Sequence, residues 1–218
     1  MFTALAREKA NRYWEGSFQH PFIQQLHEGT LAPEIFRYYL IQDRYYLEHF
    51  GKLYQLIGEQ SDRSEIKALM ATNAEHLALG EVAIRKNFFE ELGITEDEIQ
   101  NTAIAPTAYH YVSHMYRQLI EGTPNVAVAG MLPCAWLYQE IGTRLIEKGS
   151  PHALYQRWIE TYAGEESKEA IQVERNLLDQ LYNESSSDEQ EQMLAAFVIS
   201  SQMEYAFWEM AQTLETWD

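Results

Sequence analysis

Apolar side chains recur along most of this chain at the spacing of three to four residues that is typical of helices. No run of Val, Ile or Thr alternates with the period of a strand, and no segment repeats at a fixed interval. The pattern therefore predicts an all-α fold, a multi-helix bundle of about eight to ten helices. We expect it to form a single domain over residues 1–218.

Prolines and glycines mark where these helices begin and end. Five of the six prolines stand where an apolar stripe starts, and proline is favoured in the first turn of a helix. Thr95 with Glu98, and Ser187 with Gln190, have the spacing of capping boxes. We expect helices over residues 3–14, 21–29, 33–59, 62–93, 106–122, 124–149, 151–162, 166–182 and 187–217, with a short helix after Thr95.

Composition narrows the class of protein. Hydrophobic residues make up 46% of the 218 residues, which is enough for a sizeable core. The net charge of -17 opposes binding to nucleic acid. The longest apolar run, 126–138, is shorter than the roughly 20 residues that span a bilayer, and residues 1–15 lack the apolar centre of a signal peptide. With only one cysteine, we expect a cytoplasmic protein with a free thiol and no membrane partner.

The stretch from Met131 to Gly142 contains that cysteine and a proline inside a helical pattern. Pro133 has no backbone N–H and costs about 3 kcal/mol in a helix interior, so we expect the helix to break or kink there. Cys134 would then lie in the first turn after the break, where the helix dipole lowers the pKa of a thiol. Cys134 is thus a candidate nucleophile, with Tyr138 on the same face; the alternative is a small buried residue beside a structural kink.

Two carboxylates interrupt stripes that are otherwise apolar. Asp43 has tyrosines and leucines three and four residues away, and Glu204 has serines, Phe207 and Trp208 at the same spacings. Such acids are candidates for moving protons beside a reactive thiol. Each could instead lie at the end of a solvated face, the usual place of an acid.

The histidines give little support for a metal site. None has Glu or Asp three positions before it, which excludes the Glu-x-x-His signature of di-iron bundles. His110 and His114 have the spacing of a helical zinc pair but lack its intervening glutamate, so ordinary packing is the favoured interpretation. Gly51, Gly58 and Gly80 are isolated, and no glycine-rich phosphate loop is present.

Taken together, these segments resemble the TenA family, also known as thiaminase II or aminopyrimidine aminohydrolase. The resemblance extends over nearly the whole chain, and its motifs are specific as a set and in this order. They are His20-Pro21-Phe22, Phe36-x-x-Tyr39-Leu40-x-Gln42-Asp43-x-x-Tyr46-Leu47, Leu132-Pro133-Cys134-x-Trp136-x-Tyr138-x-Glu140-Ile141-Gly142 and Met203-Glu204-x-x-Phe207-Trp208-x-Met210-Ala211.

The resemblance implies a haem-oxygenase-like bundle that hydrolyses 4-amino-5-aminomethyl-2-methylpyrimidine to the hydroxymethylpyrimidine in thiamin salvage. Some members also cleave thiamin. Cys134 would add covalently to the ring, Asp43 would hold the ring nitrogen and amino group, and Glu204 would shuttle protons. The substrate-binding residues would be Tyr46, Tyr111, Tyr138, Tyr162 and Phe207. The family needs no cofactor or metal, and its members look like homotetramers.

Two alternatives from other classes stay open. One is a non-catalytic helical protein that binds a pyrimidine or regulates a partner. The other is a metal-dependent oxidase on the same bundle, which the missing Glu-x-x-His signature disfavours.

Overall fold

The computed structural model describes residues 1–84 and 88–217, without the side chains of residues 81–83, and within these ranges it contains helices and no strand. The predicted all-α fold is confirmed. The helices are α1 (Phe2–Lys9), α2 (Asn11–Phe18), α3 (Pro21–Glu28), α4 (Pro33–Gln60), α5 (Ser64–Ile84), α6 (Glu90–Leu92), α7 (Glu96–Asn101), α8 (Pro106–Glu121), α9 (Pro124–Leu145), α10 (Ala153–Tyr162), α11 (Glu165–Glu184) and α12 (Ser187–Thr213).

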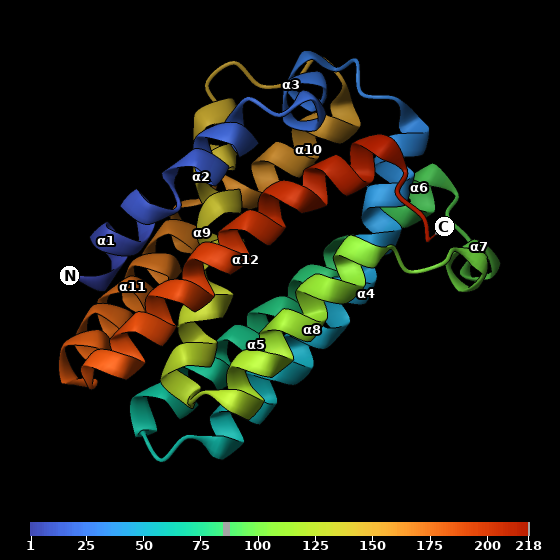
Figure 1. Cartoon of the computed structure of the whole chain (residues 1–218). Coiled ribbons are helices and arrows are strands. Elements are labelled where there is room, and N and C mark those ends of the chain that lie inside the picture. Colours follow the sequence, from blue (N-terminus) through green and yellow to red (C-terminus); the bar gives the residue numbers. More distant parts are fainter. Residues whose placement is uncertain (85–87, 218) are drawn as a thin grey trace.

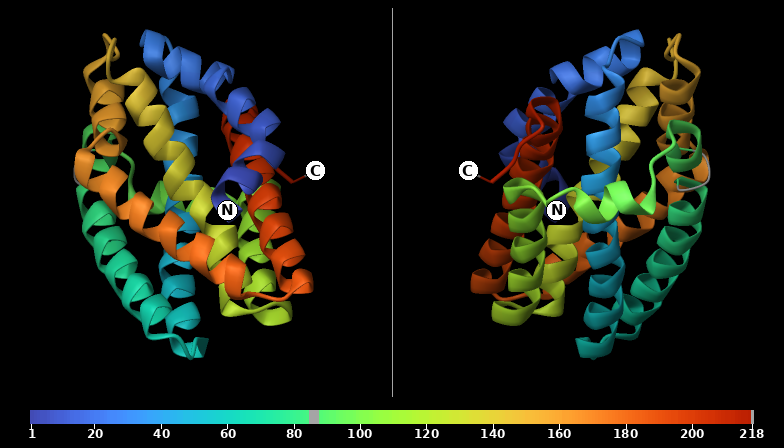
Figure 2. Two further views of the ribbon diagram at one scale, coloured as in Figure 1. Left: turned by 90° about the vertical axis from the view of Figure 1, so that its left-hand side faces the viewer. Right: turned by 90° about the vertical axis from the view of Figure 1, so that its right-hand side faces the viewer.

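Two long helices organise the bundle. α12 packs along α9 and also contacts α1, α2, α3, α4 and α8, so the last helix of the chain touches elements from both halves (Figure 1). α10 and α11 pack against α9. α5 packs mainly against α4 and lies at one edge of the molecule, and α4 runs between α5 and α8 (Figure 2). Trp14, Trp158 and Trp208 are fully buried in the core between these helices.

Most helix ends follow from residues that were expected to set them. Pro21, Pro33, Pro106 and Pro124 each occupy the first turn of their helix, as predicted. Gly29 ends α3 with φ of 76°, a conformation that favours glycine. The Thr95 side chain accepts a hydrogen bond from the Glu98 N–H, as the predicted capping box requires. At α12 the cap is Ser186 rather than Ser187, one residue earlier than expected.

Two predicted helices are divided. The segment 3–14 forms α1 and α2, because Ala10 has φ of −87° and ψ of −1°, and its N–H bonds to both Ala6 and Glu8 carbonyls. The segment 62–93 contains α5 and α6, with residues 85–87 outside the described ranges. Consequently the described residues hold twelve helices rather than eight to ten. Within these residues, no helix combines the length and the apolar character needed to cross a membrane.

Candidate active site

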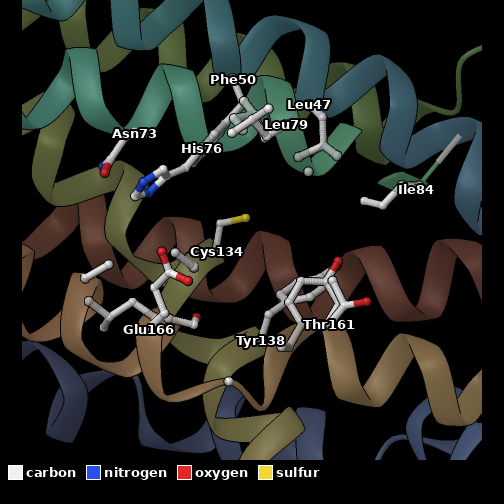
Figure 3. A pocket seen from close by; sticks show the side chains of 18 of the residues that line it. Leu47, Phe50, Asn73, His76, Leu79, Ile84, Cys134, Tyr138, Thr161 and Glu166 are labelled. Atoms are coloured by element: carbon white, nitrogen blue, oxygen red, sulfur yellow. The ribbon is translucent and has the colours of Figure 1, made fainter. Parts of the chain in front are cut away.

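A cavity of about 530 Å³ lies between α4, α5, α9, α10 and α11. Apolar and aromatic side chains dominate its wall, as is usual for sites that bind small molecules. Cys134 projects into it from α9, with Tyr138 and Thr161 nearby on one side (Figure 3). The lining residues from α4 are Asp43, Leu47, Phe50 and Tyr54; those from α5 include Asn73, His76 and Ile84; those from α9 to α11 include Cys134, Ala135, Tyr138, Thr161, Tyr162, Glu166 and Glu174.

Cys134 lies about three turns inside α9, not at a helix N-terminus. The expected break at Pro133 is absent, because the helix continues from Pro124 to Leu145 with the proline inside it. The surrounding core explains how the interruption is tolerated: all residues from Val126 to Pro133 are buried, so packing holds the segment helical despite the lost hydrogen bond.

The pKa of the Cys134 thiol is correspondingly raised, not lowered as predicted. Burial raises the pKa well above its ordinary value, and the negative charges of Glu204 and Asp43 raise it further, while the Tyr46 hydroxyl acts in the opposite direction. The thiol is therefore protonated at neutral pH, and it needs a base to become a nucleophile.

Glu204 is placed to serve as that base. It projects from α12 and is only 2% exposed, and its carboxylate Oε1 accepts a hydrogen bond of 2.6 Å from the Tyr111 hydroxyl of α8. Burial raises the pKa of Glu204 to about 7, whereas hydrogen bonds from Tyr111 and then Cys134 lower it. Near neutral pH this carboxyl can both accept and return a proton.

Asp43 lies on α4 at another part of the cavity wall and is 6% exposed. Burial raises the pKa of Tyr162, and the negative charge of Asp43 is the next largest cause. The Tyr39 hydroxyl donates to the Tyr138 hydroxyl over 3.2 Å. Asp43 is thus surrounded by phenol groups, an arrangement that suits a flat heterocycle with ring nitrogens.

Gly142 on α9 allows Tyr162 to reach the cavity. A Cβ at this glycine would lie 2.7 Å from the Tyr162 carbonyl carbon and 2.8 Å from the Ala163 nitrogen, too close for any side chain. The missing side chain lets the end of α10 approach α9, and the Tyr138 and Tyr162 ring centroids lie 4.9 Å apart.

The remaining predicted residues stand behind the cavity wall. Tyr46 is 3% exposed, and its ring lies 4.8 Å from that of Tyr111 and 5.9 Å from that of Phe207. The structure therefore brings all eight predicted site residues into one neighbourhood. Four of them line the cavity, and the other four support it through ring contacts or through the hydrogen bond to Glu204. The four residues that line the wall are Asp43, Cys134, Tyr138 and Tyr162. The four residues behind it are Tyr46, Tyr111, Glu204 and Phe207.

Several polar residues at the cavity were not predicted from the sequence, among them Asn73, His76, Thr161 and Glu174. Glu174 on α11 is 5% exposed, and its Oε2 accepts a hydrogen bond of 3.2 Å from Asn73 Nδ2 on α5. Burial raises the pKa of Glu174 to about 7, and the bond from Asn73 lowers it. A signal was available, because Glu174 stands in an apolar stripe between Ile171 and Leu178, the same criterion that selected Asp43 and Glu204.

The histidine pair has other partners. His114 Nε2 lies 3.2 Å from Ser200 Oγ, and the His110 ring packs against Trp217. Among the side chains that the structure describes, no group of three or more His, Cys, Asp or Glu residues is arranged to hold a metal ion.

Comparison with known proteins gives this site a context. An aminopyrimidine aminohydrolase of Bacillus subtilis (strain 168) is 39% identical over 216 residues, covering 99% of this chain and 92% of the relative. The prediction of an enzyme is confirmed, since an aminohydrolase is a hydrolase of carbon–nitrogen bonds.

Solved structures agree on the fold. A TenA homologue from P. horikoshii OT3 superposes with a TM-score of 0.88 at 26% identity, covering 98% of this chain and 99% of the other. A Shewanella denitrificans OS217 domain described as having a haem-oxygenase-like fold gives a TM-score of 0.73 at 14% identity, with 98% and 93% covered. The predicted fold type is therefore confirmed. The model of the TENA/THI-4/PQQC family matches residues 7–214, and the chain belongs to that family.

Proposed function

We propose that this chain hydrolyses 4-amino-5-aminomethyl-2-methylpyrimidine to the hydroxymethylpyrimidine, with the Cys134 thiol as nucleophile, and that it serves thiamin salvage. The observation that carries the proposal is the pairing of a cavity-lining thiol with a buried carboxyl whose pKa is about 7. A protonated thiol alone is a poor nucleophile, and this neighbour can remove its proton during attack.

In the first half of the reaction, Cys134 sulfur bonds to a ring carbon while Glu204 takes the thiol proton. Asp43 holds the exocyclic amino group and a protonated ring nitrogen, so the ring can accept the electron pair. The amine on the methylene group then leaves as ammonia, with the proton that Glu204 returns. The C–N bond breaks, and the sulfur remains on the ring.

In the second half, water adds to the methylene carbon and gives its proton to Glu204. Expulsion of the sulfur restores the aromatic ring and the thiol, so the net change is one water consumed and one ammonia released. Tyr138 and Tyr162 pack on the ring from the cavity wall, while Tyr46 packs against Tyr111 and Phe207 packs against Tyr46.

The test is turnover of the aminomethylpyrimidine by wild-type protein and by Cys134→Ser, with far-UV circular dichroism to check the fold. We expect the variant to keep its helical spectrum and lose nearly all turnover, and mass spectrometry to find a pyrimidine adduct on the wild-type cysteine. Full activity of Cys134→Ser would contradict the thiol mechanism. Tight binding without turnover by the wild type would favour a non-catalytic pyrimidine-binding protein.

The family resemblance adds two further parts to the proposal: a homotetrameric assembly and a cytoplasmic location. Light scattering coupled to size-exclusion chromatography tests the first, because a tetramer of this 25.4 kDa chain differs clearly from a dimer.

A further inference from the structure

A buried phenol that the proposed reaction does not use stands behind the cavity wall. Tyr39 on α4 is fully buried, and it lies one helical turn before Asp43, so the two side chains share a face of the helix. The residues that line the cavity do not include Tyr39. Its hydroxyl nevertheless has a partner that does line the cavity, because it donates to the Tyr138 hydroxyl over 3.2 Å.

The same hydroxyl also acts on the second tyrosine of the wall. Burial raises the pKa of Tyr162, and the charges of Asp43 and Cys134 raise it further. A hydrogen bond from Tyr39 acts in the opposite direction. Burial likewise raises the pKa of Tyr39, and the negative charge of Asp43 is the next largest cause. Tyr39 is therefore a hydrogen-bond partner of both cavity tyrosines and lies close to the acid between them.

Aromatic rings from three helices fix the position of Tyr39. The centroid of its ring lies 5.1 Å from that of Phe22 on α3, 5.9 Å from that of Phe36 on α4 and 5.8 Å from that of Trp208 on α12. Side chains in such a close-packed interior keep one position on average. The core therefore sets where the Tyr39 hydroxyl lies, and that hydroxyl reaches the back of the site.

The two tyrosines of the wall need such a partner. Tyr138 and Tyr162 line the cavity, and their ring centroids lie 4.9 Å apart. A phenol hydroxyl has one proton that rotates toward whichever partner is present. A fixed partner in the core restricts this rotation before a ligand enters, and a site that is ordered in advance loses less free energy on binding.

We propose that Tyr39 is a positioning residue, which orders the hydroxyls of Tyr138 and Tyr162 before a pyrimidine binds. The inference rests on the proposed function in that the ligand is the pyrimidine and that these two tyrosines pack on its ring. Tyr39 itself touches neither the ligand nor Cys134. Because the tyrosines pack on the ring both before and during the reaction, loss of the Tyr39 hydroxyl raises KM and leaves kcat nearly unchanged.

The experiment is a set of double-mutant cycles that are followed by affinity. Calorimetry measures the dissociation constant of the hydroxymethylpyrimidine, the product of the proposed reaction, so no turnover is needed. We expect Tyr39→Phe to weaken binding about fivefold, the size of one lost hydrogen bond. In the background of either Tyr138→Phe or Tyr162→Phe, the same change should weaken binding only about twofold, because one of the two hydroxyls that Tyr39 orders is already gone.

Tyr155→Phe is the matched control. Tyr155 on α10 is also buried, its ring lies 5.1 Å from that of Phe36, and its hydroxyl donates to the Leu31 carbonyl over 2.7 Å. It lies outside the cavity wall. In urea unfolding it should lose as much stability as Tyr39→Phe, yet its affinity for the pyrimidine should stay within twofold of the wild type. Equal weakening of binding by both variants would indicate a general loosening of the core and would contradict the inference.

The remaining outcomes separate this inference from the proposed function. A fivefold effect of Tyr39→Phe that persists in both backgrounds would overturn the positioning role, even if the wild type hydrolyses the aminomethylpyrimidine. The expected coupling in a wild type that binds the pyrimidine without turnover would keep the positioning role and overturn the hydrolase. In a wild type that does turn over, a fall in kcat larger than the rise in KM would place Tyr39 in the chemical step and contradict the inference. Failure of the wild type to bind the pyrimidine would overturn both.

Discussion

Glu204 and Glu174 are two buried glutamates whose pKa is raised to about 7 by the same cause, burial, in different surroundings. Glu204 receives a short hydrogen bond from a phenol and lies beside a thiol. Glu174 receives one longer bond from an amide and lines the open cavity. Burial alone therefore does not determine the role of a buried acid. The groups that contact the carboxyl determine it.

This difference in neighbouring groups predicts different roles for the two carboxyls. A carboxyl that titrates near neutral pH beside a protonated thiol can move protons during a reaction. A carboxyl with the same titration but no reactive neighbour in contact can only recognise charge or hydrogen-bond donors. Substitution of each acid by itself tests whether the two roles are separate.

The largest expected effect is on catalysis. Glu204→Gln should lower kcat/KM for aminomethylpyrimidine by about 10³-fold, because a general base typically contributes 10² to 10⁴. Steady-state kinetics with the purified variant gives the number. Glu191→Gln, an exposed acid on the same helix α12, is the matched control and should stay within twofold of the wild type. A Glu204→Gln enzyme with near-normal kcat/KM would mean that another group deprotonates Cys134.

We expect both acids to change the free energy of unfolding with pH in the same way. Each folded-state pKa is raised from 4.5 to about 7, so the folded state binds protons more tightly than the unfolded state. The stability associated with each acid is complete below pH 4.5 and is lost as pH rises through about 7, by about 3 kcal/mol. Relative to wild type, Glu174→Gln and Glu204→Gln should each gain about that much between pH 4.5 and pH 8.

Urea unfolding at the two pH values measures this gain as the change in the free energy of unfolding. If one glutamine variant shows the gain and the other does not, the surroundings of the two acids differ in polarity as well as in partners, which would contradict a common effect of burial on both pKa values.

The sequence could predict the helices whose ends carry a local signal, but not every boundary between consecutive helices. Pro33 and Gly29 act through their own backbone geometry, so the ends they set were predictable. Ala10 favours a helix by itself, yet it separates α1 from α2. It is fully buried, so its conformation depends on packing against other parts of the chain, which no local pattern records.

The candidate site shows the same limit. The motifs identified the side chains that meet at the cavity, but the predicted direction of the Cys134 pKa was wrong. That prediction used only the neighbouring Pro133, whereas burial and the charge of Glu204, which comes from α12, decide the result. Glu174 has a weaker sequence signal for a different reason, because α11 is largely polar and its apolar stripe is short.

The Tyr111 hydrogen bond offers a finer test of the Glu204 surroundings. Tyr111→Phe removes a donor that favours the ionised carboxyl, so the pKa of Glu204 should rise by about one unit, since a bond to a charged group contributes about 1.5 kcal/mol or more. Activity requires the ionised form, and the rising limb of kcat/KM against pH should move to higher pH by the same amount. Tyr109→Phe, an exposed tyrosine on the same helix, is the control. An unmoved limb would show that Glu204 is not the group whose ionisation the profile reports.

The smallest expected effect is a change in the pKa of Glu174. Asn73→Ala removes a longer, neutral donor from Glu174, so the pKa of Glu174 should rise by less than the change at Glu204, about half a unit. Carbon-13 NMR of glutamate carboxyls measures this directly, with the Glu174→Gln spectrum identifying the signal. Asn176→Ala, on the exposed face of α11, should leave the titration unchanged. A shift at Glu174 as large as the one that Tyr111→Phe causes at Glu204 would mean that Asn73 supports its carboxylate as strongly as a short phenol bond does. The distinction between a reactive acid and a recognising acid would then rest on Cys134 alone.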